Sequence, residues 1–306
     1  MRLVRVAHRI VRWPIEQRGA ATRWREREAV IIAVRTETGA TGLGEAAPLP
    51  GMSIDTIADA VAAAEALAAR VPALLETPGH ATALADRTTT APAARFAIES
   101  ALLAAYAQQT RTSVAALLSH AQPRAELRSA IVADEPHEAI GARCVKIKAG
   151  RDARAIAAAA PGARLRIDAN RTWPQGEVTA RMSALADLPI DFVEEPCADA
   201  HELLDRPLPC RIALDESLVE LAPAELARAL ESPQLAALVL KPTLLGGFSR
   251  CLELAAEAHR HGVAPIVSHA LEGPIGYAAC IELARAIGAD VPVGLGPHPA
   301  LVGAYR

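Results

Sequence analysis

Five charged residues between positions 148 and 241 each end a short apolar run. In chain order they are Lys148 in VKIK, Asp168 in RIDAN, Glu194 in DFVEEP, Asp215 in ALDES and Lys241 in LVLKP. Taken singly, an Asp or Glu in such a place is often only a turn residue or a helix cap. Together, in the order Lys, Asp, Glu, Asp, Lys, they predict one site with acid-base chemistry.

The three acidic residues of this series predict a metal site. Buried carboxylates that converge repel one another unless a cation lies between them. A set of ligands made only of oxygen suits Mg²⁺, and the sequence does not separate Mg²⁺ from Mn²⁺. We therefore expect Asp168, Glu194 and Asp215 to hold a divalent cation.

Lysine is scarce in this chain. Of 32 Lys and Arg residues, lysine stands only at positions 146, 148 and 241. A guanidinium keeps its proton, whereas an ammonium beside a divalent cation and a second lysine can lose it and act as a base. We expect Lys148 to be the base and Lys241 to face it across the metal. Lys146 points to the same face as Lys148, where its charge favours the neutral amine of its neighbour.

Short β-rich runs alternate with helical segments from about residue 127 onward. This rhythm predicts parallel strands with helical crossovers, and the number of runs suits an α/β fold of the (β/α)7β barrel type. Catalytic residues of such barrels lie at the carboxyl ends of the strands, which is where the five charged residues stand. The predicted strands are residues 129–133, 144–148, 165–168, 192–194, 212–215, 237–241, 265–268 and 291–295.

The N-terminal part has a different pattern and predicts a small α+β domain. Residues 3–11 and 29–36 are strand-like, residues 42–53 are rich in Gly and Pro, and residues 54–69 and 94–118 are helical. The stretch 77–92 is a candidate boundary. We therefore predict an α+β domain over residues 1–93 and a barrel over residues 94–296. Return of the C-terminal residues 297–306 to the α+β domain stays open.

The composition excludes several classes of protein. The formal charge of -3 gives no basic footprint for nucleic acid, and no run approaches the roughly 18 apolar residues of a membrane span. The first residues alternate apolar with basic and do not form a signal-peptide core, so we expect a cytoplasmic protein. The five cysteines have no metal-site spacing, which predicts reduced, buried side chains.

Six motifs make the chain resemble a known family. They are GLGEAAPLPGMS at 42–53, VKIKAG, RIDANRTW, FVEEPC, ALDESL and LKPTLLGG. Together they resemble the enolase superfamily, in its muconate-lactonizing subgroup, and they are most similar to the o-succinylbenzoate synthases of that subgroup. The resemblance spans nearly the whole chain.

This resemblance implies an activity and a role for each main residue. The enzyme would dehydrate 2-succinyl-6-hydroxy-2,4-cyclohexadiene-1-carboxylate to o-succinylbenzoate, a step toward menaquinone. Lys148 would remove the α-proton, the three carboxylates would hold Mg²⁺, and Lys241 would stabilise the enolate by a cation–π contact. The N-terminal domain would cap the barrel, with residues 15–24 and 48–53 shaping specificity. The only partner that the resemblance implies is a small-molecule carboxylate substrate. The protein would be a monomer or a homo-oligomer.

Further candidates flank the main residues. Asn170 lies two residues after a predicted ligand, and Glu195 and Glu216, each directly after one, are expected to make supporting hydrogen bonds. Arg166 either contacts a substrate carboxylate or forms a buried ion pair in the barrel. Ser268 and His269 end the seventh strand and are candidates for the substrate wall.

His269 and residues 294–296 bear on the alternatives. Mandelate-racemase relatives place a catalytic His where His269 stands, but pair it with an acid on the sixth strand, where this chain has Lys241. Dipeptide epimerases of the superfamily carry Asp-x-Asp on the eighth strand, where this chain has Gly294-Leu295-Gly296. That activity is therefore disfavoured, an N-succinylamino acid racemase stays open, and a non-catalytic binding barrel is the alternative from another class.

Overall fold

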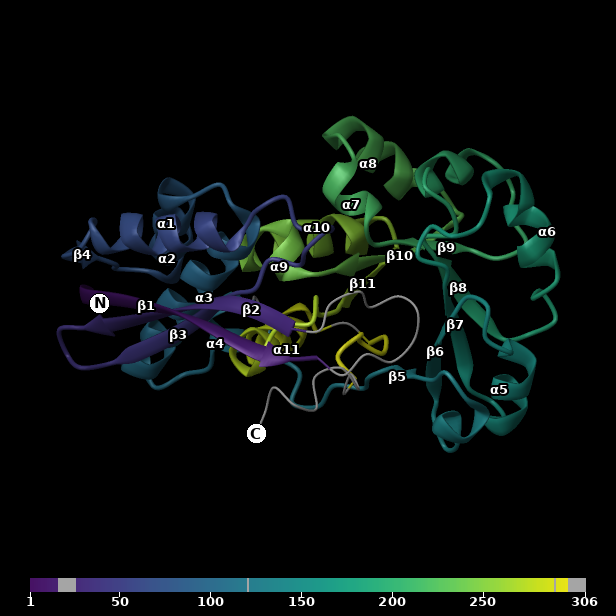
Figure 1. Cartoon of the computed structure of the whole chain (residues 1–306), viewed down its shortest axis with the longest axis horizontal. Coiled ribbons are helices and arrows are strands. Elements are labelled where there is room, and N and C mark those ends of the chain that lie inside the picture. Colours follow the sequence, from purple (N-terminus) through teal and green to yellow (C-terminus); the bar gives the residue numbers. More distant parts are fainter. Residues whose placement is uncertain (16–25, 120, 289, 297–306) are drawn as a thin grey trace.

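The computed structural model describes residues 1–15, 26–119, 121–288 and 290–296. Figure 1 shows two parts side by side. An antiparallel sheet with its helices forms the N-terminal part, drawn in purple and blue, and a curled parallel sheet forms the second part. Helices α9, α10 and α11 of the second part lie against the first.

The N-terminal sheet has the order β3-β2-β1-β4 within the described residues. Strands β1 and β2 pair over nearly their whole length, from Leu3 opposite Thr36 to Pro14 opposite Glu26. The sheet and its helices confirm the predicted α+β unit. Its elements are β1 (Arg2–Pro14), β2 (Glu26–Thr36), β3 (Thr41–Ala46), α1 (Ile57–Ala68), β4 (Ala73–Leu74), α2 (Pro78–Thr88), α3 (Pro92–Thr110) and α4 (Val114–Leu118).

Helix α3 packs directly on β3 because two glycines leave room for its backbone. A Cβ at Gly42 or Gly44 would lie 1.9 or 1.8 Å from a carbonyl oxygen of α3, that of Ala101 or Ala97. Any side chain at these positions would therefore push the helix away from the sheet. The glycines of the GLGE motif thus set the distance between α3 and β3.

Local details of this part differ from the prediction. The Gly/Pro-rich segment 42–53 begins with most of strand β3, and the stretch 77–92 is largely helix α2. The predicted helix over 94–118 is two helices, because Arg111 adopts a left-handed conformation with φ of 55° and Ser113 caps α4. The division between residues 93 and 94 stays a prediction.

The second sheet is parallel, with the order β11-β10-β9-β8-β7-β6-β5. Each strand lies beside its neighbour in sequence, as helical crossovers of one hand require. The strands are β5 (Ile131–Val132), β6 (Cys144–Lys148), β7 (Arg164–Asp168), β8 (Ile190–Glu194), β9 (Ile212–Leu214), β10 (Leu235–Leu240) and β11 (Ala264–Val267). The helices are η1 (Pro136–Ala139), α5 (Ala153–Ala159), η2 (Gln175–Glu177), α6 (Val178–Ser183), η3 (Ala200–Asp205), α7 (Ser217–Glu220), α8 (Pro223–Glu231), α9 (Pro242–Leu245), α10 (Phe248–Arg260) and α11 (Pro274–Ile287).

The predicted eighth run, residues 291–295, joins the two edges of this sheet through isolated bridges. Val293 bridges to Ser129 beside β5, and Gly294 bridges to Ser268 beside β11. The amide of Gly294 also donates to the carbonyl of Val267 at 2.8 Å. The run is thus in the place of a closing strand, although it is too irregular to be a strand of its own.

Successive side chains along each strand point to opposite faces of the sheet and form two apolar layers. Side chains such as Ile147, Ile167 and Leu240 join the large core between strands and helices. Those of Phe192 and Val239 join a smaller cluster on the other face. The charged residues that end the strands lie on this second face, because side chains two residues apart on a strand point to the same face of the sheet.

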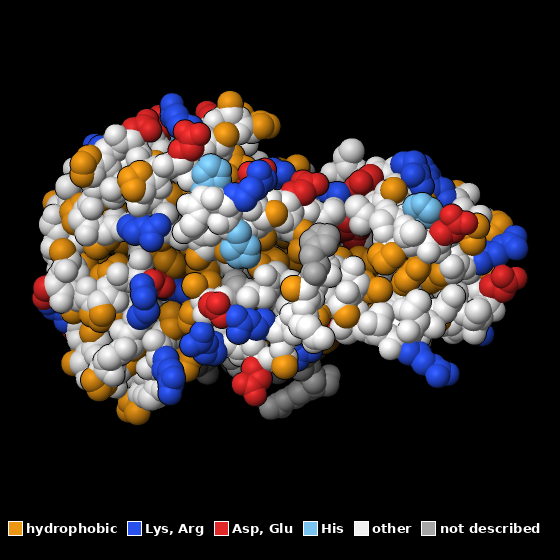
Figure 2. Space-filling view, turned by 180° about the vertical axis from the view of Figure 1, so that it is seen from behind, with side chains coloured by type: hydrophobic (Ala, Val, Ile, Leu, Met, Phe, Trp, Pro, Cys, Tyr) orange, Lys and Arg blue, Asp and Glu red, His pale blue; other side chains and the backbone are white. Residues whose placement is uncertain are grey.

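Charged side chains on the surface are mixed. On the face shown in Figure 2, Lys and Arg, in blue, are dispersed among Asp and Glu, in red. The chain has five cysteines, and all five are buried and free of disulfides, as expected. Among the described residues, no helix has both the length and the apolar character needed to cross a bilayer.

Candidate active site

The predicted site residues lie along one edge of the parallel sheet. The register places Lys148 opposite Asp168, and Asp168 opposite Glu194. Asp215 directly follows β9, and Lys241 directly follows β10. Parallel strands end at the same edge of a sheet, so the five residues form a row in chain order. The three acidic residues are almost inaccessible, with exposed fractions of 2, 2 and 4%.

Each lysine of the chain contacts one or two of these carboxylates. Lys146 Nζ lies 2.9 Å from Asp168 Oδ2 and 2.8 Å from Glu194 Oε1. Lys148 Nζ donates to Asp168 Oδ2 at 2.6 Å, and Lys241 Nζ donates to Asp215. The chain's three lysines therefore gather in one site, with Lys148 and Lys241 at its two ends.

Burial and charge act against each other in this row. Burial alone would raise the pKa of Asp168, but the ammonium groups of Lys146 and Lys148 hold that pKa well below its usual value. Burial, and then the charge of Asp168, raise the pKa of Glu194 to about 7. Burial also raises the pKa of Asp215, although Lys241 opposes it. The lysines thus offset the effect of burial on the carboxyl pKa more completely for Asp168, toward one end of the row, than for Glu194 in its middle.

The lysines respond to the same charges. Burial would lower the pKa of Lys146, but Asp168, Glu194 and Asp215 outweigh it and raise that pKa above its usual value. The same competition raises the pKa of Lys241. A cation that neutralised the carboxylates would weaken the attraction that keeps these two ammonium groups protonated.

The donor set of the row fits a hard divalent cation. It consists of buried carboxylate oxygens, and Glu194 is held between two other acids whose charges it senses. Among the described residues, no three Asp, Glu, His or Cys side chains already surround a common point. The ammonium of Lys146 lies between Asp168 and Glu194 instead. A cation bound by these acids would take over part of the charge compensation that Lys146 provides.

Asn170 and Glu216 extend the row. Asn170 Oδ1 accepts from Lys148 Nζ at 2.7 Å, and the backbone N–H of Asn170 donates to Asp168 Oδ1 at 3.1 Å. Asn170 has a left-handed φ of 43°, which short polar side chains tolerate best. Glu216 Oε1 lies 3.5 Å from Asn170 Nδ2, while its Oε2 is buried without a hydrogen bond. Both residues thus lie beside the main groups.

Glu195 organises the turn that presents Asp215. Its Oε1 accepts from the amides of Asp215 and Ser217 at 2.7 and 2.9 Å. Its Oε2 accepts from Ser217 Oγ at 2.9 Å and from Arg171 Nε at 3.1 Å. Glu195 is fully buried and has a left-handed φ of 42°. The supporting role expected for it is what the contacts show, whereas Arg171 was not predicted, because nothing distinguishes it among so many arginines.

Arg166 lies one layer below the row. Its Nε pairs with Asp191 Oδ2 at 3.1 Å, its Nη1 donates to the carbonyl of Pro292 at 2.7 Å, and its guanidinium lies 4.9 Å from the ring centre of Phe192. These contacts match the buried ion pair, which was one of the two alternatives that the sequence left open for Arg166.

Ser268 and His269 follow β11 on the far side of Lys241. Ser268 Oγ donates to the carbonyl of Gly294 at 3.1 Å. His269 Nδ1 accepts from the amide of Leu271 at 3.2 Å, and its ring meets that of Tyr277 edge to face. Of the first predicted specificity segment, residues 16–24 lie outside the described residues. In the second, residues 48–53, Leu49 packs against Leu244 in a small apolar cluster.

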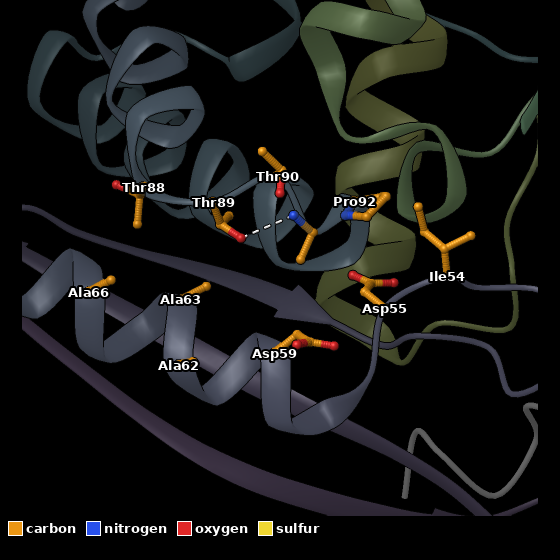
Figure 3. Close-up of a pocket in the computed structure, with 11 residues that line it drawn as sticks. Ile54, Asp55, Asp59, Ala62, Ala63, Ala66, Thr88, Thr89, Thr90 and Pro92 are labelled. Atoms are coloured by element: carbon orange, nitrogen blue, oxygen red, sulfur yellow. Dashed lines mark hydrogen bonds between the residues drawn. The ribbon is translucent and has the colours of Figure 1, made fainter. Parts of the chain in front are cut away.

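A separate hollow of about 480 Å³ lies within the N-terminal part. Figure 3 shows it between α1 and the turn that leads into α3, with Asp55 and Asp59 at one end and Thr88 at the other. Asp55 Oδ2 accepts from the amide of Ala93 at 2.8 Å, so this buried acid caps α3. None of the lining residues belongs to the predicted site.

Comparison with known families decides the relationship. The family model described as "Mandelate racemase / muconate lactonizing enzyme, N-terminal domain" matches residues 2–119, and "Enolase C-terminal domain-like" matches residues 128–298. The chain belongs to the enolase superfamily. The resemblance seen in the motifs, and the barrel fold with its separate N-terminal domain, are therefore confirmed.

Relatives within the superfamily include two named enzymes. The chain is 30% identical to the o-succinylbenzoate synthase of Pectobacterium atrosepticum, an alignment that covers 89% of this chain and 83% of that protein. It is 31% identical to the o-succinylbenzoate synthase of Haemophilus influenzae, with 89 and 82% covered. Among solved structures, a dipeptide epimerase from Methylococcus capsulatus with Mg and the dipeptide L-Arg-D-Lys superposes with a TM-score of 0.84 at 24% identity, covering 99% of this chain and 92% of that one.

Proposed function

We propose that this enolase-superfamily chain is an o-succinylbenzoate synthase. The proposed reaction is the Mg²⁺-dependent syn-dehydration of 2-succinyl-6-hydroxy-2,4-cyclohexadiene-1-carboxylate. The observation that supports it best is the row itself, in which Lys148 and Lys241 bracket three buried carboxylates. The named relatives at about 30% identity support the same activity.

Asp168, Glu194 and Asp215 are the residues that would hold Mg²⁺. Bound there, the cation would polarise the substrate carboxylate and stabilise the negative charge that develops on it. Mn²⁺ has the same preference for oxygen and is a possible substitute.

Lys148 is proposed to transfer the protons. Asp168 and Asn170 hold its Nζ at 2.6 and 2.7 Å, which orients it toward one end of the row. In its neutral form it takes the proton from the carbon beside the carboxylate. The resulting ammonium then returns that proton to the leaving hydroxyl on the same face, so that the C–O bond breaks, the ring becomes aromatic and water departs.

Lys241 is proposed to stay charged and to stabilise the substrate from the opposite end. Its ammonium contacts Asp215, which raises its pKa and keeps its proton in place. A charged amine over the face of a forming aromatic ring lowers the energy of the enolate.

An N-succinylamino acid racemase is the second candidate. It is favoured by the same pair of lysines, one at each end of the row, since racemisation needs a proton donor and an acceptor on opposite faces. A dipeptide epimerase is less well supported. Gly294 and Gly296 offer no acid for a substrate ammonium, and a Cβ at Gly294 would lie 2.7 Å from Ser268 Oγ.

A paired assay tests the proposal. Loss of the cyclohexadiene is followed by absorbance, and racemisation of N-succinyl amino acids by polarimetry, for the wild type, Lys148→Ala and Lys241→Ala. The synthase predicts dehydration that both variants lose. Racemisation without dehydration would make the chain a racemase. Absence of both activities, with Mg²⁺ still bound, would favour a binding barrel.

A further inference from the structure

The backbone segment that carries Ser268 and His269 is held in place by side chains of the N-terminal part. Arg27 donates to the carbonyls of Ala270 and Leu271 at 3.3 and 3.2 Å. Three residues later, the amide of Gly273 donates to Glu45 at 2.5 Å. The segment thus follows a barrel strand, but its residues 270, 271 and 273 bind side chains of strands β2 and β3.

Arg27 also holds a segment of its own domain. Its Nη2 donates to the carbonyl of Ala47 at 2.6 Å and its Nη1 to that of Pro48 at 2.8 Å. The side chain is 1% exposed. A single buried guanidinium therefore binds four backbone carbonyls, two from residues 47–48 and two from residues 270–271. The planar fork of Arg supplies donors in several directions at once, whereas the single Nζ of Lys cannot span both segments.

Burial opposes the charge of Arg27 and lowers the pKa of its guanidinium below the usual value. Glu272 and Glu45, which are both buried, act in the opposite direction and favour the charged form. Glu272 is occupied by Thr243 Oγ1 and by the amide of Ala270 at 2.5 and 2.7 Å. Glu45 accepts from the amides at the start of α11, Gly273 and Gly276. The two acids therefore leave the guanidinium free to bind carbonyls.

The two segments that Arg27 joins meet at an apolar cluster beside the row. Leu49, Leu244 and Ala270 are buried there, with Met52 and Val219 partly buried against them. Leu244 lies three residues after Lys241, and Val219 lies four residues after Asp215. Any loosening of residues 47–53 or 268–273 would therefore disturb the wall next to the proposed charged lysine.

We propose that Arg27 is a positioning residue that locks residues 47–53 of the N-terminal domain to the turn 268–273 of the barrel, and that this lock sets how tightly the substrate is held. The kinetic part of this inference rests on the proposed function, whereas the lock itself does not. Arg27 touches none of the groups assigned to proton transfer or metal binding, so its loss should affect substrate binding more than chemistry.

Kinetics of Arg27→Gln and Arg27→Lys test the consequence for binding. We expect both variants to raise KM by about tenfold or more while kcat falls by a much smaller factor, because the reacting groups stay in place. Arg27→Lys keeps the charge but should not restore KM. The matched control is Arg70→Gln, since Arg70 also donates to two carbonyls of the N-terminal part, those of Ala66 and Arg87, but far from the turn. An unchanged KM in Arg27→Gln, or full rescue by lysine, would overturn the proposal.

Hydrogen–deuterium exchange tests the lock without any substrate. In Arg27→Gln, peptides that cover 47–53 and 268–273 should both exchange faster, while peptides from β6, β7 and β8 keep their wild-type rates. Faster exchange in only one segment, in neither, or throughout the protein contradicts the lock. A wild type that turns over neither candidate substrate would refute the proposed function, and this exchange pattern would still decide the role of Arg27.

Discussion

Lys148 is the residue on which the proposed chemistry depends most directly. Its ammonium touches Asp168 and Asn170, so a substitution removes a proton carrier without opening the hydrophobic core. We expect Lys148→Met to lower kcat by roughly 10²- to 10⁴-fold, the usual contribution of a general base. Circular dichroism and Mg²⁺ titration should match the wild type. Activity within about threefold of wild type would show that another group takes the proton.

Glu194 is the central acid of the row and should be the most sensitive to loss of a metal ligand. Glu194→Gln keeps the shape of the side chain but removes a negative charge from between Asp168 and Asp215. We expect it to weaken Mg²⁺ binding by at least about tenfold in calorimetric titration. Glu65→Gln, on the exposed face of α1, is the matched control and should bind Mg²⁺ normally. Equal affinities in the two variants would remove Glu194 from the ligand set.

At the scale of elements, the turn between β9 and α7 depends on one buried acid. Glu195 accepts from two amides, a hydroxyl and a guanidinium. Glu195→Ala would leave these donors unsatisfied, and we expect a loss of about 3 to 5 kcal/mol in the free energy of unfolding by urea. Glu220→Ala removes only an ion pair with Arg171 near the surface and should cost less than about 1 kcal/mol. Similar costs for the two variants would contradict this assignment.

Strand β3 and helix α11 are joined by Glu45, which should make stability depend on pH. Burial raises the pKa of Glu45 from its ordinary value of 4.5 to about 7. Between these values the unfolded chain has released the proton and the folded chain keeps it, so folding stability falls as pH rises from about 4.5 to 7 and then levels off.

Unfolding of wild type and Glu45→Gln across this pH range tests the effect. The variant should lose part of the slope because glutamine does not titrate, and Glu194, with its similarly raised pKa, should account for a remainder. If Glu45→Gln has the full wild-type slope, Glu45 is ionised throughout the range.

At the scale of the whole molecule, a cation in the row should stabilise the fold. The acids that would bind it come from β7, β8 and the residue after β9, so binding would tie three strand ends together. A ligand at a hundred times its Kd adds about 2.7 kcal/mol to the stability of the folded state. We expect Mg²⁺ to raise Tm, EDTA to reverse the rise, and Glu194→Gln to reduce it. A Tm that does not respond to Mg²⁺ would contradict binding at this row.

Much of this protein was predictable from local pattern. The order of the strands, the charged residues at five strand ends and the scarcity of lysine are all properties of the chain read in sequence. Parallel strands joined by crossovers must end at one edge, so Lys148, Asp168 and Glu194 had to become neighbours once the strands formed. The break in the helix at Arg111 was not predictable in the same way, because alanine-rich residues on both sides favour helix.

The tertiary structure decided what contacts between distant segments determine. Arg166 carries the same charge as many other arginines, and only the fold pairs it with Asp191. The contacts of Arg27 and Glu45 with the barrel were not predictable from the sequence, because these partners are backbone groups more than 220 residues away, and backbone groups leave no trace in side-chain pattern. The chemistry of the row is thus encoded locally by residue type and spacing, whereas the lock between domain and barrel depends on packing that only the folded chain creates.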